Sequence, residues 1–457
     1  MPRRSSRVAE PDPAATFAAL PRGSTADVRI ITSASATIRF STSRVRQPHL
    51  ERSTQVSLRV ADGRRLATAT GSDVSPSGLA ALSASARALA RIAPIEPKFP
   101  GFPSASGRTP PPIAFSKSTA DFSPEGATRI AEEILDAALS EAPGARVAGV
   151  VHVGAETLRV ANSAGLDRST RRSMAFASVL VERPEQDPPV SGWSEGAHWD
   201  AGRLSAAAIG REAAQRMARS APAAVSPGRY AVVFRGPAVA DLLMFLAHLG
   251  FAANGEVEGW SCLAHRRGKR VAPETVTIVD DARSRETLPR AIDYEGTWTR
   301  PTPLVTKGVA GPVVTDLLTS GRLRRPLTGH ALPPEAPWGD FGPIPMNLHL
   351  APGDASEEEL IRDTRRGLLV TRFHYVRVVD PGRGVITGMT RDGTYEIEHG
   401  EVARPARNLR FTESVLTALE SVRLVGKVRR IYSEGGDCVT APPLAVGSFR
   451  FTSATLF

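Results

Sequence analysis

The sequence predicts an α+β protein with two domains. We expect an N-terminal α/β-type domain of mixed sheets and helices, followed by a C-terminal β-rich, barrel-like domain. The length of 457 residues exceeds what one ordinary core holds. Strand-like and helix-like segments alternate up to about residue 222, whereas strands dominate from residue 223 onward, after the turn-forming Ser226-Pro227-Gly228-Arg229.

The N-terminal 24 residues differ from both domains. They are rich in Arg and Pro and lack the apolar core of a signal peptide, so residues 1–24 are expected to be a disordered tail. No apolar run reaches the roughly 18 residues of a membrane span. We therefore expect a cytoplasmic protein without a membrane partner.

Residues 25–222 carry the signals of the first domain. The alternating segment 26–40 predicts two strands of a hairpin or meander, and Asp62-Gly63 predicts the turn of a second hairpin. Further strands are expected at residues 56–60, 66–70, 147–153, 158–161 and 174–181.

Helices in this domain are indicated by their capping residues. Ser75-Pro76 and Ser123-Pro124 each precede apolar residues spaced three or four apart, which is typical of a helix N-terminus. A third helix is expected from about residue 205 to 219. The stretch 94–112 is dense in Pro, Gly and Ser and predicts a linker.

Residues 223–457 predict mostly strands. These are expected at residues 230–234, 276–279, 304–307, 368–373, 384–389, 394–397, 406–411 and 448–452. Helical patterns at residues 239–249 and 356–362 interrupt them. The Pro- and Gly-rich stretch 326–345 predicts a long functional or interface loop.

Composition excludes several classes of site. Two cysteines cannot form a disulfide framework or a four-Cys zinc site. The net charge of +10 invites a nucleic-acid partner, but the cations are nearly all Arg and are scattered along the chain. Compositional bias of a GC-rich genome explains them better, so nucleic acid is not the expected partner.

Several motifs occur in one order along the chain. They are VSLRVADGRRLATAT at 56–70, ANSAGL at 161–166, DYEG at 293–296, LVTKGV at 304–309 and LTGH at 327–330. This succession resembles the TldD/PmbA family of proteolytic proteins, and the resemblance covers about residues 25 to 457.

The resemblance breaks at one helix. The TldD branch carries H-E-x-x-x-H there, in which two His hold zinc and the Glu acts as base on zinc-bound water. Here Met244 and Phe245 stand where His and Glu belong, and Leu249 takes the second His position. No catalytic residue is therefore expected in this chain, which is similar to the PmbA/TldE branch that lacks the motif.

Two residues keep a metal hypothesis open. Cys438 stands where the TldD branch carries its third ligand, and His248 is the sole His of the helix. A relic or partly buried thiol and an exposed or satisfied helix His are the favoured interpretations. The alternative is a noncanonical metal site that joins Cys438 to His248, His265, His330 or His374. The acidic pairs Asp280-Asp281 and Asp293/Glu295 are expected to cap turns or pair with Arg.

The resemblance implies a non-catalytic or weakly catalytic subunit of a heteromeric TldD/TldE-type zinc metallopeptidase that acts on unfolded or short peptides. The partner would be a TldD-like subunit that carries H-E-x-x-x-H and the zinc, so no cofactor is expected in this chain. Substrate-binding residues are not predicted. One alternative is a stand-alone peptide- or conjugate-processing enzyme with a noncanonical metal site including Cys438. The other is a DNA-associated regulator.

Overall fold

The first sheet of the protein is built almost entirely from very long strands. The computed structural model describes residues 11–105, 109–186, 189–333, 336, 342–433 and 438–455. The sheet has six strands in the order β3-β2-β1-β4-β5-β6, and all its pairings are antiparallel. Its strands are β1 Thr25–Ser41, β2 Arg44–Asp62, β3 Arg65–Gly71, β4 Arg146–Asn162, β5 Asp167–Arg183 and β6 Val190–His198.

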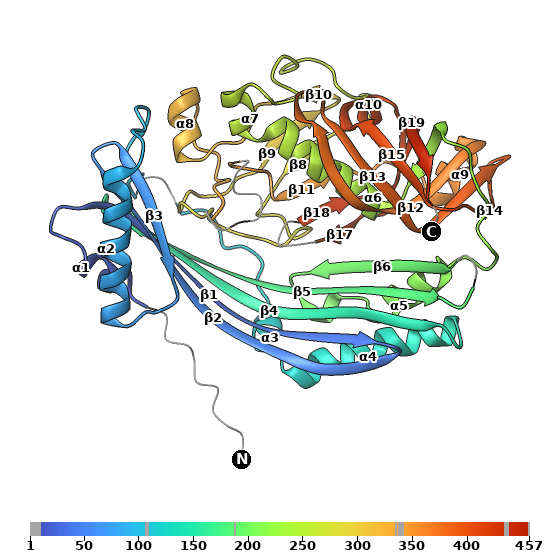
Figure 1. Ribbon diagram of the computed structural model, residues 1–457, viewed down its shortest axis with the longest axis horizontal. Helices are drawn as coiled ribbons and strands as arrows, with labels where there is room; N and C mark the ends of the chain where they lie inside the picture. Colours follow the sequence, from blue (N-terminus) through green and yellow to red (C-terminus); the bar gives the residue numbers. More distant parts are fainter. Residues whose placement is uncertain are drawn as a thin grey trace.

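Helices cover one face of this sheet. They are α1 Pro13–Ala18, α2 Pro76–Ile92, α3 Lys117–Ala120, α4 Pro124–Glu141, η1 Ala201–Arg203 and α5 Ala206–Gln215. The hydroxyls of Ser75 and Ser123 cap α2 and α4, as predicted, by accepting from the amides of Gly78 and Gly126. In Figure 1, α4 lies below the sheet and the C-terminal elements lie above it.

The two faces differ because side chains alternate along a strand. On β1, Val28 and Ile38 point to the helices and are fully buried in apolar clusters. Their neighbours Asp27 and Thr37 point to the opposite face, which looks toward the C-terminal elements. This opposite face carries most of the polar contacts described below.

The C-terminal part contains two further sheets. One has the order β10-β9-β8-β11-β18-β17, and the other has the order β12-β7-β19-β15-β13-β14. An additional β12–β13 pairing turns the latter sheet back on itself, which makes it barrel-like. The strands are β7 Gly228–Phe234, β8 Ile278–Asp280, β9 Thr302–Thr306, β10 Val309–Ala310, β11 Asn347–Leu350, β12 Arg366–Asp380, β13 Val385–Glu398, β14 Glu401–Pro405, β15 Leu409–Ser414, β16 Val422–Val425, β17 Arg430–Tyr432, β18 Cys438–Ala441 and β19 Leu444–Ala454.

Short helices connect the strands of this part of the chain. They are α6 Gly236–Leu246, the π-helical segment η2 Ala247–Phe251, α7 Ala253–Glu258, α8 Leu317–Leu323, α9 Glu357–Thr364, η4 Pro381–Arg383 and α10 Val415–Glu420. Helix α6 packs against β12, β18 and α10 and lies at the centre of the largest apolar cluster. No helix within the described ranges is long and apolar enough to cross a bilayer.

The α+β class is confirmed, but several sequence predictions need correction. Residues 26–40 form one strand rather than two, and residues 147–161 likewise lie within the single strand β4. The expected mixed sheet of the N-terminal domain is antiparallel throughout, and the parallel pairs β7–β12 and β11–β18 occur in the C-terminal part.

The tail and the long loop were predicted less well. Residues 13–18 form α1, with Thr16 fully buried, where a disordered tail was expected; residues 1–10 lie outside the described residues. Much of the loop at 326–345 also lies outside them, because residues 334–335 and 337–341 are not described.

Candidate functional site

Helix α6 carries Met244 and Phe245, two of the three residues that the sequence assigns to the positions of the missing zinc motif. It follows β7 directly, and Arg235 at its N-cap is fixed by ion pairing with Glu357 at 2.7 Å. The residues assigned to the motif positions, Met244, Phe245 and Leu249, are all apolar. Met244 and Phe245 are half-buried and pack against the central cluster, and Leu249 is fully buried within it. None of the three offers a nitrogen or oxygen to a metal, so the residues present do not fit a zinc ion.

The backbone at this point is unusual. Met244 and Leu249 stand five residues apart, which is the spacing of the two His in H-E-x-x-x-H. The π-helical segment η2 begins at Ala247, between them, and a π turn brings residues five apart into closer alignment than an α turn does. Met244 therefore lies in the last turn of α6, and Leu249 lies within the π-helical segment.

His248 lies inside the protein next to these residues. It is buried, and its ring lies 6.3 Å from that of Phe245. Burial lowers its pKa to about 4, so the imidazole is neutral at physiological pH. The sequence favoured an exposed or satisfied helix His, whereas the side chain is buried in an apolar setting.

Cys438 is the first residue of β18, and its side chain is buried on the face of that strand that points away from α6. Its thiol packs with Ala197, Trp199 and Leu288, and its sulfur accepts from the Leu288 amide at 3.3 Å. The next residue, Val439, instead joins the central cluster that contains α6. Because neighbouring side chains on a strand point to opposite faces, Cys438 faces the first sheet and not α6.

The remaining histidines are dispersed. His330 is buried and contacts Asp280 at 3.2 Å, whereas His265 is exposed and His374 is only half-buried. Within the part of the chain that the structure describes, no three His, Cys, Asp or Glu side chains are grouped closely enough to hold a metal ion. Cys438 is thus not brought together with two further ligands among those residues.

A charged network covers the first sheet beneath Cys438. Glu156 on β4 pairs with Arg172 on β5 at 3.1 Å, and Arg290 from the C-terminal part approaches Glu156 to 4.0 Å. Burial acts to raise the pKa of Glu156, but the two guanidinium groups outweigh it and hold the pKa below its ordinary value. These ion pairs join the two parts of the chain.

A second network fixes the other end of this contact. Arg59 on β2 pairs with Asp27 on β1 and with Glu295, both at 2.7 Å. Asp293 accepts from the amides of Glu295 and Thr297 and so fixes the turn that carries Glu295. The expectation that this acidic pair caps a turn and binds Arg agrees with these contacts.

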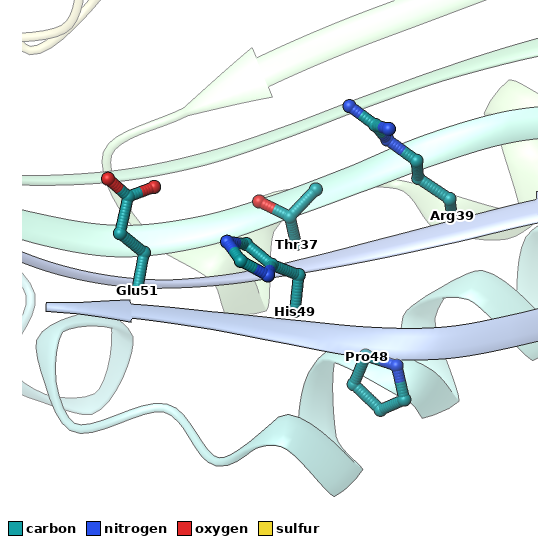
Figure 2. A pocket seen from close by; sticks show the side chains of 5 residues that line it. All are labelled: Thr37, Arg39, Pro48, His49 and Glu51. Atoms are coloured by element: carbon teal, nitrogen blue, oxygen red, sulfur yellow. The ribbon is translucent and has the colours of Figure 1, made fainter.

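The same face of the first sheet is open at the far end of β1 and β2. Figure 2 shows Thr37 and Arg39 on β1 beside His49 and Glu51 on β2. These four residues, called the open strip below, line a shallow hollow of about 590 Å³ together with Pro48. Thr37 also contacts His152 Nδ1 on β4 at 3.0 Å. Sequence reasoning did not select the open strip, although its alternation with buried Ala36, Ile38 and Phe40 could have revealed it.

Comparison with protein families accounts for nearly the whole fold. The PmbA/TldA metallopeptidase domain 1 matches residues 26–93, the central domain matches residues 117–221, and the C-terminal domain matches residues 227–453. The chain belongs to the PmbA/TldD family.

Individual relatives agree with this membership. A metalloprotease of Methanothermobacter thermautotrophicus is 30% identical over 227 residues, which are 49% of this chain and 48% of that protein. A zinc metalloprotease TldD homolog of Saccharolobus solfataricus is 25% identical over 206 residues, 44% of either chain. The chain thus aligns with about half the length of these curated relatives.

A solved structure is similar over a greater length. The crystal structure of TldE from Thermococcus kodakarensis matches with a TM-score of 0.84 at 19% identity, covering 96% of this chain and 98% of that one. This likeness shows that the two chains share a fold.

Proposed function

We propose that this chain is a non-catalytic subunit of a heteromeric, zinc-dependent peptidase of the PmbA/TldD family. The observation that carries the proposal is the packing of Met244, Phe245 and Leu249 at the positions of the zinc motif. A zinc ion and the base that activates its water need exposed or cavity-lining polar ligands. A partner subunit with H-E-x-x-x-H supplies them in this proposal.

The role proposed for this chain is to hold an extended peptide. The open strip offers a cation, a carboxylate, an imidazole and a hydroxyl on an accessible sheet face. Next to it, β3 pairs only with residues 56–62 of β2, and no described strand pairs with the outer edge of residues 44–55. A strand edge binds extended chains through main-chain hydrogen bonds and therefore tolerates many sequences.

This arrangement suits unfolded or short peptides rather than folded substrates. A folded protein presents few free main-chain groups, whereas an unfolded segment can add to a sheet edge as a strand. Pro48 and the Arg residues of β2 interrupt that edge and limit uncontrolled pairing with other chains.

The proposal is tested by reconstitution. The purified chain is mixed with a TldD-like, H-E-x-x-x-H-containing chain from the same genome, and cleavage of an unfolded casein-type substrate is followed. We expect the chain alone to show no cleavage above buffer and the mixture to exceed the TldD-like chain alone at least tenfold. Cleavage by this chain alone that a chelator abolishes would overturn the proposal and favour a stand-alone enzyme.

Variants separate peptide holding from assembly. Arg39→Ser with Glu51→Gln removes both charges of the open strip and should raise the KM of the mixture several-fold while its kcat stays similar. Arg91→Ser is the matched control, because Arg91 is exposed at the end of α2 on the helix-covered side. Equal kinetics for both variants would show that the open strip does not hold the peptide.

A further inference from the structure

A second hollow lies at one end of the barrel-like sheet. It has a volume of about 550 Å³ and lies where β7, β13, β15, β19 and α10 meet. Four arginines from separate elements line it: Arg229, Arg266, Arg383 and Arg450. We call it the basic hollow. In the sequence these residues are up to 221 positions apart, since 450 − 229 = 221, and so they looked scattered.

The strand register sets two of these cations side by side. Arg229 on β7 and Arg450 on β19 are direct cross-strand partners. Like charges directly opposite each other destabilise an antiparallel pair. A sheet carries such a pair at lower cost when a negative group neutralises it.

The protein itself neutralises the hollow only in part. Glu413 pairs with Arg229 at 2.9 Å, and Glu420 pairs with Arg266. In the described part of the chain, the guanidinium groups of Arg383 and Arg450 have no recorded ion pair or hydrogen bond. Four cations against two carboxylates leave two positive charges in the hollow, since 4 − 2 = 2.

The rest of the lining adds hydroxyl groups and no further charge. Thr412, Ser414 and Thr417 border the hollow. The hydroxyl of Thr412 already donates to Thr387 Oγ1 and that of Ser414 to the Arg383 carbonyl, which leaves the Thr417 hydroxyl as the one of these three that can donate to a ligand. Burial raises the pKa of the Cys262 thiol to about 12, so it is neutral at physiological pH. The hollow therefore presents excess guanidinium groups beside the Thr417 hydroxyl.

We propose that the basic hollow binds the phosphate group of a small molecule, with Arg450 and Arg383 as its principal cations. Guanidinium groups match the geometry of phosphate oxygens and can bind them in a bidentate manner. A volume of about 550 Å³ suits a single small ligand. The carboxylates of Glu413 and Glu420 in the lining disfavour a long polyanion that would run across the hollow.

Calorimetric titration of the full chain with inorganic phosphate at low ionic strength tests this proposal. We expect saturable binding with a dissociation constant near or below about 1 mM. Arg450→Ala and Arg383→Ala should each weaken it roughly tenfold. Arg410→Ala is the matched control: it removes an exposed arginine of β15 that does not line the hollow, and should change affinity less than about twofold.

Two further readouts make the result decisive. Binding should be tighter at pH 7.5 than at pH 5.5, because a much larger share of inorganic phosphate carries its second negative charge at the higher pH. Arg450→Ala should not lower the melting temperature, since it relieves the repulsion from Arg229. Absence of phosphate binding up to about 10 mM, or equal weakening by Arg410→Ala, would overturn the proposal.

A DNA titration distinguishes the source of the phosphate. A duplex of about 20 base pairs is titrated under the same conditions at several salt concentrations. We expect weak binding that Arg450→Ala and Arg410→Ala reduce equally. Tight DNA binding with a steep salt dependence, lost selectively in Arg450→Ala, would assign the basic hollow to a nucleic-acid backbone and overturn the small-molecule proposal.

Discussion

The α6–η2 segment and the open strip of the first sheet have opposite surroundings. Residues 244–249 join an apolar core that is fully enclosed at Leu249. The open strip carries Arg39, His49 and Glu51 on an accessible face next to an uncovered strand edge. Met244, Phe245 and Leu249 carry no polar group that could hold a metal, whereas the open strip carries groups that could contact a peptide.

The two regions also differ in what holds each of them in place. At the positions that the sequence assigns to the motif H-E-x-x-x-H, apolar side chains pack along the end of α6 and the π-helical segment η2. The polar face of the first sheet does not depend on the ligands of that motif, because β1, β2 and β4 hold it in register. Substitutions in the first region should therefore change stability, and substitutions in the second should change function.

The largest effect is expected at Leu249. Leu249→Ala should lower the free energy of unfolding by about 2–5 kcal/mol, because it opens a cavity in a fully enclosed core. Leu50→Ala, at a side chain that is 61% exposed on β2, should change it by no more than about 0.5 kcal/mol. Urea denaturation measures both, and similar values would contradict the assignment of Leu249 to the core.

An intermediate effect is expected from the titration of His248. Its folded pKa is depressed to about 4, so the unfolded chain takes up a proton first as pH falls below about 6.5. The contribution of His248 to the free energy of unfolding is therefore fully present above about pH 6.5 and is lost progressively as the pH falls to about 4. At pH 5 the loss is about 2 kcal/mol, given the pKa of about 4 in the folded state.

The control for this titration is His248→Gln, which cannot take up the proton. Urea denaturation at pH 7.5 and pH 5.0 should show that the variant lacks this part of the wild-type loss. A wild-type and a variant that lose the same stability would mean that His248 is accessible to protons in the folded protein.

The smallest effect on stability is expected in the open strip. Arg39→Ser with Glu51→Gln should change the free energy of unfolding by less than about 0.5 kcal/mol, since both side chains lie at an open hollow. Thermal unfolding measures this change beside the kinetic assay of the same variant. A large loss of stability would show that these charges support the sheet rather than a ligand.

Local sequence signals predicted part of the fold well. The Asp62-Gly63 turn and the Ser-Pro starts of α2 and α4 were recognisable because their chemistry depends on adjacent residues. The long strand β1 was divided wrongly, because small residues at 33–36 weaken the strand signal and only pairing with β2 and β4 carries the strand through them.

The candidate sites depended on contacts that no local pattern contains. The assignment of Met244, Phe245 and Leu249 to the motif positions rests on sequence order alone and stays a prediction. The side of β18 from which Cys438 projects became known only from the sheet register. The basic hollow was likewise hidden, because its arginines come from four separated elements that meet only in the folded chain.

The central claim is that this chain supplies no zinc site of its own, and the zinc content of the purified chain tests it most directly. The wild type and Cys438→Ser are each dialysed against zinc-containing and then metal-free buffer, and bound zinc is counted by mass spectrometry. We predict well below one zinc per chain for both proteins. About one tightly held zinc per chain in the wild type, lost in Cys438→Ser, would contradict the account and establish Cys438 as a metal ligand.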